Sequence, residues 1–194
     1  MKIRSTGAPL YRLKVTLREW RPPIWRRFVV PSDITLKRCH DALQAVMGWT
    51  NSHLHQFEAR GVIYGTSDPE YGFRRLSESR TTLDQVLLKP RDRMKYEYDF
   101  GDGWEHDIVL EAVLPSEPGG IYPRVEGGKR ASPPEDVGGV HGYAHFLEAI
   151  GDPKHPEHRD MVDWSGGTFD PDAFTVRQAN LDIHGGWTRI ERNA

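Results

Sequence analysis

Acidic side chains gather around one glycine-rich turn, and they are the first candidates for chemistry. The turn Gly101-Asp102-Gly103 separates two stretches in which apolar and charged residues alternate. The carboxylates on or beside it are Asp99, Asp102, Glu105 and Asp107. Divalent cations such as Mg²⁺ and Mn²⁺ prefer several oxygen ligands and can activate water against a phosphate ester. The cluster therefore predicts a metal-dependent phosphoester-processing enzyme, or alternatively a solvent-facing strand whose aspartate is fixed by turn geometry.

His106 is the histidine closest to these carboxylates in the sequence. It alternates with Trp104 and Ile108 on the apolar face of the expected strand, which is typical of a hydrogen-bonded core residue. A metal site made by Asp99, Asp102 and His106 is the less favoured alternative. A zinc site made by His53, His55 and His106 is conceivable if their strands are neighbours. The residues call for no cofactor, and a divalent metal remains an alternative.

A second acidic pair, Glu135-Asp136, follows two prolines and precedes Gly138-Gly139. Acidic side chains accept hydrogen bonds from the free N–H groups of a first helical turn, so the pair indicates a capped helix start. Alternatively, Asp136 supports a groove beside the turn at residues 101–103. Both interpretations place a structural boundary here.

Motifs of several enzyme classes are missing from the chain. It has neither phosphate-binding glycine loop, G-x-x-x-x-G-K-[ST] or G-x-G-x-x-G, and no G-x-S-x-G nucleophile turn. The acidic-x-Lys step of many nucleases occurs only as Asp152-Pro153-Lys154, where proline disfavours a strand. His141 and His145 lack the glutamate that a zinc protease places after the first histidine. The catalytic residues, if any exist, are thus unknown from sequence.

Basic residues concentrate in the N-terminal part of the chain. Residues 1–60 hold 11 Lys and Arg against 4 Asp and Glu, a balance of +7, and residues 61–194 hold 15 against 24, a balance of −9. Arginine meets phosphate and aromatic rings stack on bases, so a basic hairpin predicts DNA or RNA as a partner. Its candidate binding residues are Arg12, Lys14, Arg18, Trp25, Arg26 and Arg27. Alternatively, these arginines bridge to the acidic C-terminal helices and the two fields cancel.

The elements that must position these residues follow from periodicity. Alternation predicts strands at 11–20 and 24–30, joined through Pro22-Pro23, at 53–59 and 62–64, and on both sides of the turn at 101–103. Helical spacing between an N-cap at Thr35 and a C-cap at Gly48 predicts one helix. Residues 83–88 form a helical turn or two, and residues 65–81 are expected to be a surface loop.

The second half of the chain is predicted to be a long loop followed by helices. Eleven prolines and glycines between 115 and 140 predict a long pinned loop. Helices are expected at about 141–150, 156–164 and 171–183, the last with Asp170 as N-cap and Pro171 in its first turn. Strands followed by helices predict a single α+β domain over 1–194, with its core at about 9–183. Its architecture is expected to be one antiparallel sheet built from hairpins, with helices packed on one face.

Several of these stretches resemble the plasmid pRiA4b Orf-3-like family. The matching stretches are 98–106, 133–139, 142–143, 11–15, 25–26, 48–49 and 53–54. The resemblance implies an α+β fold and an association with plasmids and transposable elements, in part under resolvase-like names, and it supplies no catalytic residues. Cysteines common in the family's proline-rich loop are here Val125, Ser132 and Val137, so a thiolate metal site is not expected.

Composition narrows the class of protein further. The mean hydropathy is −0.64, and no apolar run reaches the roughly 20 residues of a membrane helix. The start lacks a secretory signal, and Cys39 is the single cysteine, so we expect a cytoplasmic protein without disulfides. We expect a non-enzymatic binding or accessory module, with nucleic acid as its first candidate partner and no membrane partner. The alternatives are the phosphoester enzyme and a protein-interaction domain that uses the loop at 115–140.

Overall fold

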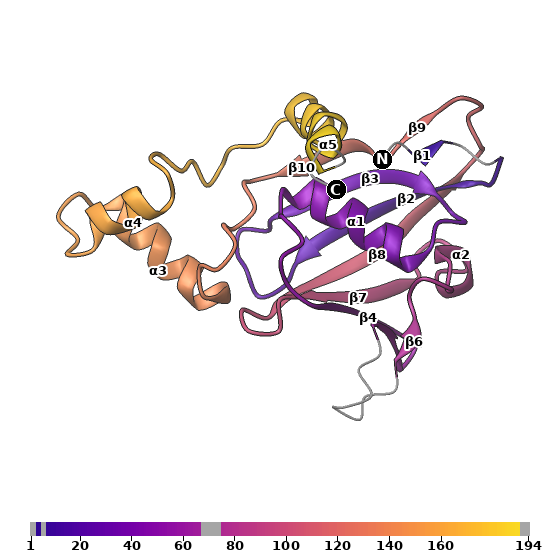
Figure 1. Cartoon of the computed structure of the whole chain (residues 1–194), viewed down its shortest axis with the longest axis horizontal. Helices are drawn as coiled ribbons and strands as arrows, with labels where there is room; N and C mark the ends of the chain where they lie inside the picture. The colour runs from indigo at the N-terminus through magenta and orange to yellow at the C-terminus, as the bar shows by residue number, and fades with distance from the viewer. Residues whose placement is uncertain (1–2, 5–6, 67–74, 191–194) are drawn as a thin grey trace.

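The computed structural model describes residues 3–4, 7–66 and 75–190, and in this part of the chain it shows an α+β fold (Figure 1). An eight-stranded sheet has the order β10-β3-β2-β8-β7-β4-β5-β6. Its strands are β2 (Leu10–Leu17), β3 (Trp25–Pro31), β4 (His55–Ala59), β5 (Val62–Gly65), β6 (Leu76–Ser77), β7 (Arg93–Tyr98), β8 (Trp104–Leu114) and β10 (Arg124–Lys129).

The three predicted hairpins are confirmed. β2 pairs with β3, β4 with β5 and β7 with β8, each antiparallel. Two further antiparallel pairings, β2 with β8 and β4 with β7, join the hairpins into one sheet. The expectation of a purely antiparallel sheet is wrong, because β6 runs parallel to β5. This short strand lies in the segment 65–81, of which residues 67–74 lie outside the described residues.

The region predicted to be one long loop, 115–140, contains two strands. β9 (Ile121–Tyr122) pairs with β1 (Ile3–Arg4), and β10 forms the edge of the large sheet beside β3. Gly127-Gly128 conceal β10 in the sequence, and its pairing shifts by a bulge after Val125. A side chain at Gly128 would collide with the ring of Phe174. The edge is covered by the amide of Asn180, which hydrogen-bonds both N–H and C=O of Val125 at 2.9 Å.

The first helix follows its sequence signals. α1 (Leu36–Met47) begins where Thr35 Oγ1 accepts a hydrogen bond from the Arg38 N–H at 3.3 Å, and ends at Gly48 with φ of 79°. It lies against one face of the sheet (Figure 1). The side chains of His40 and Gln44 reach the hydroxyl of Tyr96 on β7. Together with the short α2 (Leu83–Val86), it closes the main core.

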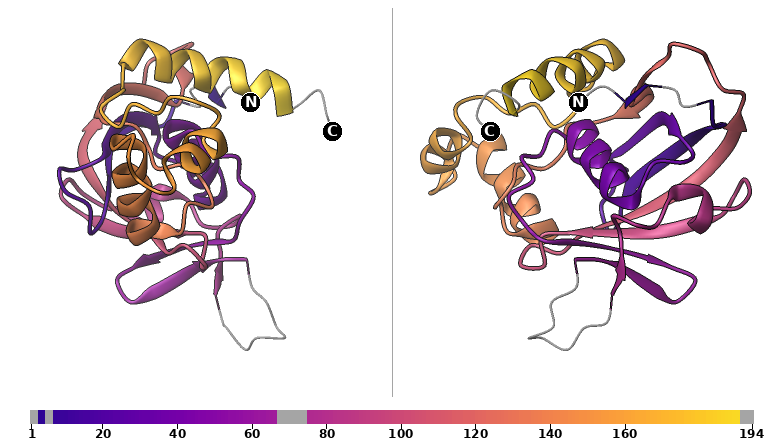
Figure 2. Two further views of the ribbon diagram at one scale, coloured as in Figure 1. Left: turned by 90° about the vertical axis from the view of Figure 1, so that its left-hand side faces the viewer. Right: turned by 45° about the vertical axis from the view of Figure 1, so that its right-hand side comes forward.

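Three helices follow the last strand. α3 (Gly139–Gly151) and α4 (His158–Trp164) form a lobe at one end of the sheet, whereas α5 (Val176–Ile190) contacts α1 and β10 (Figures 1 and 2). The helix predicted at 171–183 starts later than expected, because Asp170 Oδ1 accepts from the Asp172 N–H and forms a turn. Thr175 instead accepts from the Gln178 N–H at 3.1 Å. Among the described helices, none is long and apolar enough to cross a membrane.

Candidate functional site

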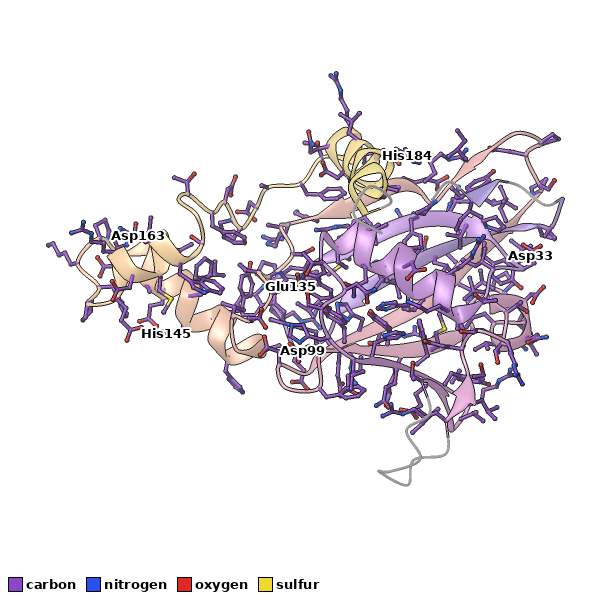
Figure 3. All side chains as sticks on the ribbon, viewed as in Figure 1. Asp33, Asp99, Glu135, His145, Asp163 and His184 are labelled. Carbon is purple, nitrogen blue, oxygen red and sulfur yellow. The ribbon has the colours of Figure 1, made fainter. Side chains whose placement is uncertain are left out.

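Three ionisable side chains from separate segments converge at the end of the sheet next to α3. His53 lies in the loop after α1, Asp99 in the turn after β7 and Asp136 in the turn before α3. His53 Nδ1 lies 3.5 Å from Asp99 Oδ2, and His53 Nε2 lies 3.0 Å from Asp136 Oδ1. Figure 3 labels Asp99 and also Glu135, the residue before Asp136, at this end of the sheet. We call these three residues the tip–loop cluster.

Asp99 has two roles, one for each carboxylate oxygen. Its Oδ1 accepts hydrogen bonds from the N–H groups of Gly101 and Asp102, at 3.0 and 3.4 Å. The predicted role of an aspartate fixed by its turn is therefore confirmed. The left-handed positions of this turn are Asp99 (φ 57°) and Gly103 (φ 66°). Because Oδ1 is held by the backbone, Oδ2 is left facing His53.

Asp102 lies outside the tip–loop cluster and joins the hairpin to α3. Its Oδ2 accepts a hydrogen bond from the Gly138 N–H at 3.1 Å, and its carbonyl oxygen occupies the space that a Cβ at Gly139 would need. A carboxylate thus does meet the start of the helix, as charge at a helix N-terminus favours. It comes from the hairpin tip, so the interpretation of Glu135-Asp136 as the capping pair is wrong.

Glu135 instead holds two loops together. Its carboxylate accepts hydrogen bonds from the Thr50 N–H at 2.9 Å, the Thr50 hydroxyl at 2.6 Å and the Tyr98 hydroxyl at 2.6 Å. Asp136 follows with φ of 60° and a side chain that is 68% exposed. The alternative interpretation, in which Asp136 supports a groove beside the turn at residues 101–103, is met only in part: Asp136 contacts His53, which also faces Asp99 of that turn, but Glu135 and not Asp136 lines the neighbouring cleft.

Trp104 and His106 are core residues, each 0% exposed. His106 Nδ1 lies 3.0 Å from the carbonyl oxygen of Trp104, so Nδ1 carries the proton. Burial lowers the pKa of His106 to about 4. The metal set of Asp99, Asp102 and His106 is therefore not assembled. Glu105, also named as a candidate, points the other way and forms an ion pair with Arg18.

The zinc site of His53, His55 and His106 is not formed either. His55 stacks on His40, with ring centroids 3.4 Å apart and planes 2° apart, and its Nε2 lies 2.7 Å from Glu78 Oε2.

His40 itself is held in a chain of hydrogen bonds. Tyr96 accepts a hydrogen bond from Gln44 and donates to His40 Nδ1 at 2.8 Å. His40 Nε2 then donates to Asn51 at 2.6 Å. Burial lowers the pKa of His40 to about 3.

The basic hairpin has its own acidic partners. Arg12 pairs with Glu126 at 2.6 Å and Arg27 with Glu111 at 2.5 Å. These glutamates lie on β10 and β8, so the expected bridges to the C-terminal helices are wrong for these arginines. Lys14 lies over the ring of Trp25, 4.9 Å from its centroid.

Arg26 is not part of this face. It is 3% exposed and donates to the carbonyl oxygens of Trp25, Val46 and Lys129. Its burial lowers its pKa to about 10. The guanidinium of Arg26 thus connects β3 and β10 to α1, and its N–H groups donate to carbonyl oxygens within the protein.

A cleft of about 700 Å³ opens next to the tip–loop cluster. Its walls are the end of α1, the segment 132–135 and residues between 165 and 182. Trp49 forms part of the first wall and donates from Nε1 to the carbonyl oxygen of Pro133 at 3.0 Å. Glu135 lines the cleft as well, so the two features share a wall.

Sequence reasoning placed Asp99 and Asp136 correctly near one turn, but it assigned His53 to a different set. The register of β4 and β7, with His55 opposite Tyr98, is what brings His53 to Asp99. That pairing joins segments about 40 residues apart in the chain, and no local pattern predicts it. The stretch at 53–54 was, however, among those shared with the family.

The comparisons with known proteins agree with this fold. An uncharacterized protein, y4hQ of Sinorhizobium fredii, is 42% identical over 190 residues, which cover 95% of this chain and 97% of that protein. A crystal structure of a protein of unknown function, MM3350 from Methanosarcina mazei Go1, is 38% identical with a TM-score of 0.80, over 89% of this chain and 98% of the other. The family model of the plasmid pRiA4b ORF-3-like protein matches residues 9–178, and the chain belongs to this family.

Proposed function

We propose that this protein is a binding module for a divalent cation, held by His53, Asp99 and Asp136. The observation that carries the proposal is the state of His53 Nε2. This atom is shielded from solvent and makes no hydrogen bond, because its 3.0 Å contact with Asp136 is poorly aligned for one. Two ligands bound at about 2.0–2.2 Å to one cation lie about 3 Å apart, so the pair has the right separation to share one.

The ligand chemistry favours Mn²⁺ or Zn²⁺. One imidazole with two carboxylates is a mixed nitrogen and oxygen set, which suits these ions better than Ca²⁺. Two carboxylates neutralise the charge of the cation. Three protein ligands leave coordination positions open to water or to an oxygen-rich ligand. The ligand atoms of the three residues lie within 4.8 Å of one another. Because Asp136 faces Nε2 of His53 and Asp99 faces Nδ1, Asp99 must turn toward Nε2 to join a cation held by the other two residues.

Replacing His53 with alanine is expected to weaken Mn²⁺ binding by at least about 100-fold, since loss of a ligand exceeds the effect of outer-shell changes. Asp99→Asn and Asp136→Asn are sharper variants. Asparagine keeps an oxygen for the turn and tolerates left-handed φ, so each removes charge without forcing a new backbone. Isothermal titration calorimetry and Mn²⁺ electron paramagnetic resonance measure the affinity. Binding should also weaken on acidification, because the ligands must be deprotonated.

His145→Ala and Asp163→Asn are the matched controls. Both residues lie on the lobe of α3 and α4, away from Asp99 (Figure 3). They should leave the Mn²⁺ affinity unchanged. Equal affinity in wild type and His53→Ala, or no uptake of Mn²⁺ or Zn²⁺ by the wild type, would overturn the proposal.

A phosphoester-processing enzyme is the second candidate, supported by the open coordination positions. A cation there can hold a phosphate oxygen and activate a bound water. Hydrolysis of bis(p-nitrophenyl) phosphate by the Mn²⁺-loaded protein tests this activity. Turnover that requires both Mn²⁺ and His53 would establish an enzyme, whereas binding without turnover leaves the accessory module.

Nucleic-acid binding through the basic hairpin has weaker support. Arg12 and Arg27 are paired with glutamates, and a phosphate must displace these partners before it gains the charge. Lys14 and Trp25 are the residues that favour it. Fluorescence anisotropy with labelled DNA and RNA at 50 mM salt decides the matter, and binding that falls steeply with salt and on Lys14→Ala would support it.

A further inference from the structure

We infer that cation occupancy of the tip–loop cluster controls the shape of the adjacent cleft, through Tyr98 and Glu135. This inference rests on the proposed cation site. It adds a second, coupled site to that function.

The ring of Tyr98 lies directly between the two sites. On one side it stacks on Trp49, which lines the cleft, with centroids 5.1 Å apart and planes 21° apart. On the other side the ring of His53 meets it edge-on, with centroids 5.8 Å apart. A change in the position of His53 therefore reaches Trp49 through one intervening side chain. Packed interiors transmit such shifts because they contain little free volume.

Glu135 makes a second connection. Its carboxylate fixes the hydroxyl of Tyr98 and both polar groups of Thr50. It also lines the cleft, and it precedes the cluster residue Asp136 in the chain. Because Trp49 donates to the carbonyl of Pro133, the loops at 49–53 and 133–136 are bound to each other along the wall of the cleft. A cation bound between His53 and Asp136 is therefore attached to both loops.

The electrostatics explain why occupancy changes this wall. Asp99 and Asp136 place two carboxylates on one imidazole, Glu135 precedes Asp136 in the chain, and like charges that lie close together repel. A divalent cation removes this repulsion and so changes the forces on the two loops. By reciprocity, a ligand that fills the cleft and prefers the cation-bound form of this wall raises the cation affinity by the same factor.

The test uses ¹⁹F nuclear magnetic resonance of the full chain labelled with 5-fluorotryptophan. Zn²⁺ is the probe because it is diamagnetic, and Trp49→Phe assigns the Trp49 resonance. Saturating Zn²⁺ should shift the Trp49 resonance of the wild type. The resonance of Trp164 on α4 is the internal reference and should stay in place. Glu135→Gln keeps all three ligands, so it should still saturate, with a loss in affinity of no more than about 10- to 100-fold.

The inference requires that saturated Glu135→Gln shows a clearly smaller Trp49 shift than wild type. Tyr98→Phe is the second variant, in case Glu135→Gln does not fold. It keeps the ring stacked on Trp49 and removes only the hydroxyl. Calorimetry on the same samples separates the outcomes. Zinc uptake without a Trp49 shift, or with equal shifts in all variants, overturns the coupling and leaves the cation site; no uptake overturns both.

Discussion

Replacing Gly139 with alanine is expected to destabilise the protein by about 3–5 kcal/mol, from left-handed strain and a lost hydrogen bond to a carboxylate. Gly139 has φ of 67°, and a Cβ there would overlap the carbonyl oxygen of Asp102. The hairpin tip must then move away from α3. The bond from the Gly138 N–H to Asp102 is lost with that movement. Urea unfolding followed by circular dichroism measures the change.

Substitutions at two other glycines separate the two causes of this destabilisation, which are the strain of a left-handed φ and the overlap of a Cβ with a neighbouring carbonyl oxygen. Gly61, in the turn between β4 and β5, has φ of 75° but open space around it, so Gly61→Ala reports strain alone, about 1–2 kcal/mol. Gly142 does not have a left-handed φ, but a Cβ there would overlap the carbonyl oxygen of Val137. Gly142→Ala should destabilise despite the higher helix propensity of alanine. If Gly139→Ala lowered the free energy of unfolding by no more than Gly61→Ala does, the contact between the hairpin tip and the start of α3 would make no contribution to stability.

This contact gives a physical reason for the stretches at 98–106 and 133–139. Within them, Asp102 accepts from Gly138, Tyr98 donates to Glu135, and Trp104 and His106 fill the core. Most of these residues serve the docking of one segment on the other. The tip–loop cluster forms at the same junction, with Asp99 from one segment and Asp136 from the other. A shape-determining role and a cation site are therefore compatible in the same residues.

The elements predicted well are those whose signals are local. Alternation placed β2, β3, β7 and β8, and the cap residues Thr35 and Gly48 bounded α1 within a residue. β10 was missed because Gly127-Gly128 and a bulge interrupt its alternation. Its strand conformation is imposed by the neighbouring β3, and by Phe174 and Asn180 from the C-terminal segment. Such tertiary causes leave no trace in a local window.

The candidate site shows the same division. A cluster of carboxylates at the turn was visible in the sequence, whereas the partner of each was not. Glu105 forms an ion pair with Arg18, about 90 residues away in the chain, and Asp102 accepts a hydrogen bond from Gly138. His53 enters only through the pairing of β4 with β7. Counts of charged residues likewise predicted a basic face. Such counts do not show that Glu111 and Glu126 lie opposite the arginines of this face and pair with them.

The protein is also expected to lose about 2 kcal/mol of stability for each of two buried histidines between pH 7 and pH 5. Burial lowers the pKa of His106 to about 4 and of His40 to about 3, against about 6.5 in an unfolded chain. Across this window the unfolded chain binds more protons than the folded one, so acid favours unfolding. Above about pH 7 both states are neutral at these positions, and their contribution is constant.

His106 shows why the proton is excluded. Its Nδ1–H already donates to Trp104, and a proton added at Nε2 would be buried without an acceptor among the described residues. His106→Gln should therefore reduce the stability lost between pH 7 and pH 5 by about 2 kcal/mol. Urea unfolding at each pH, with chelator present to exclude the cation, measures this. Glutamates held by arginines, such as Glu111, have a lowered pKa and lose their contribution only below about pH 4.5, outside the window. Equal pH dependence in wild type and His106→Gln would show that His106 takes up its proton in the folded core as readily as in the unfolded chain.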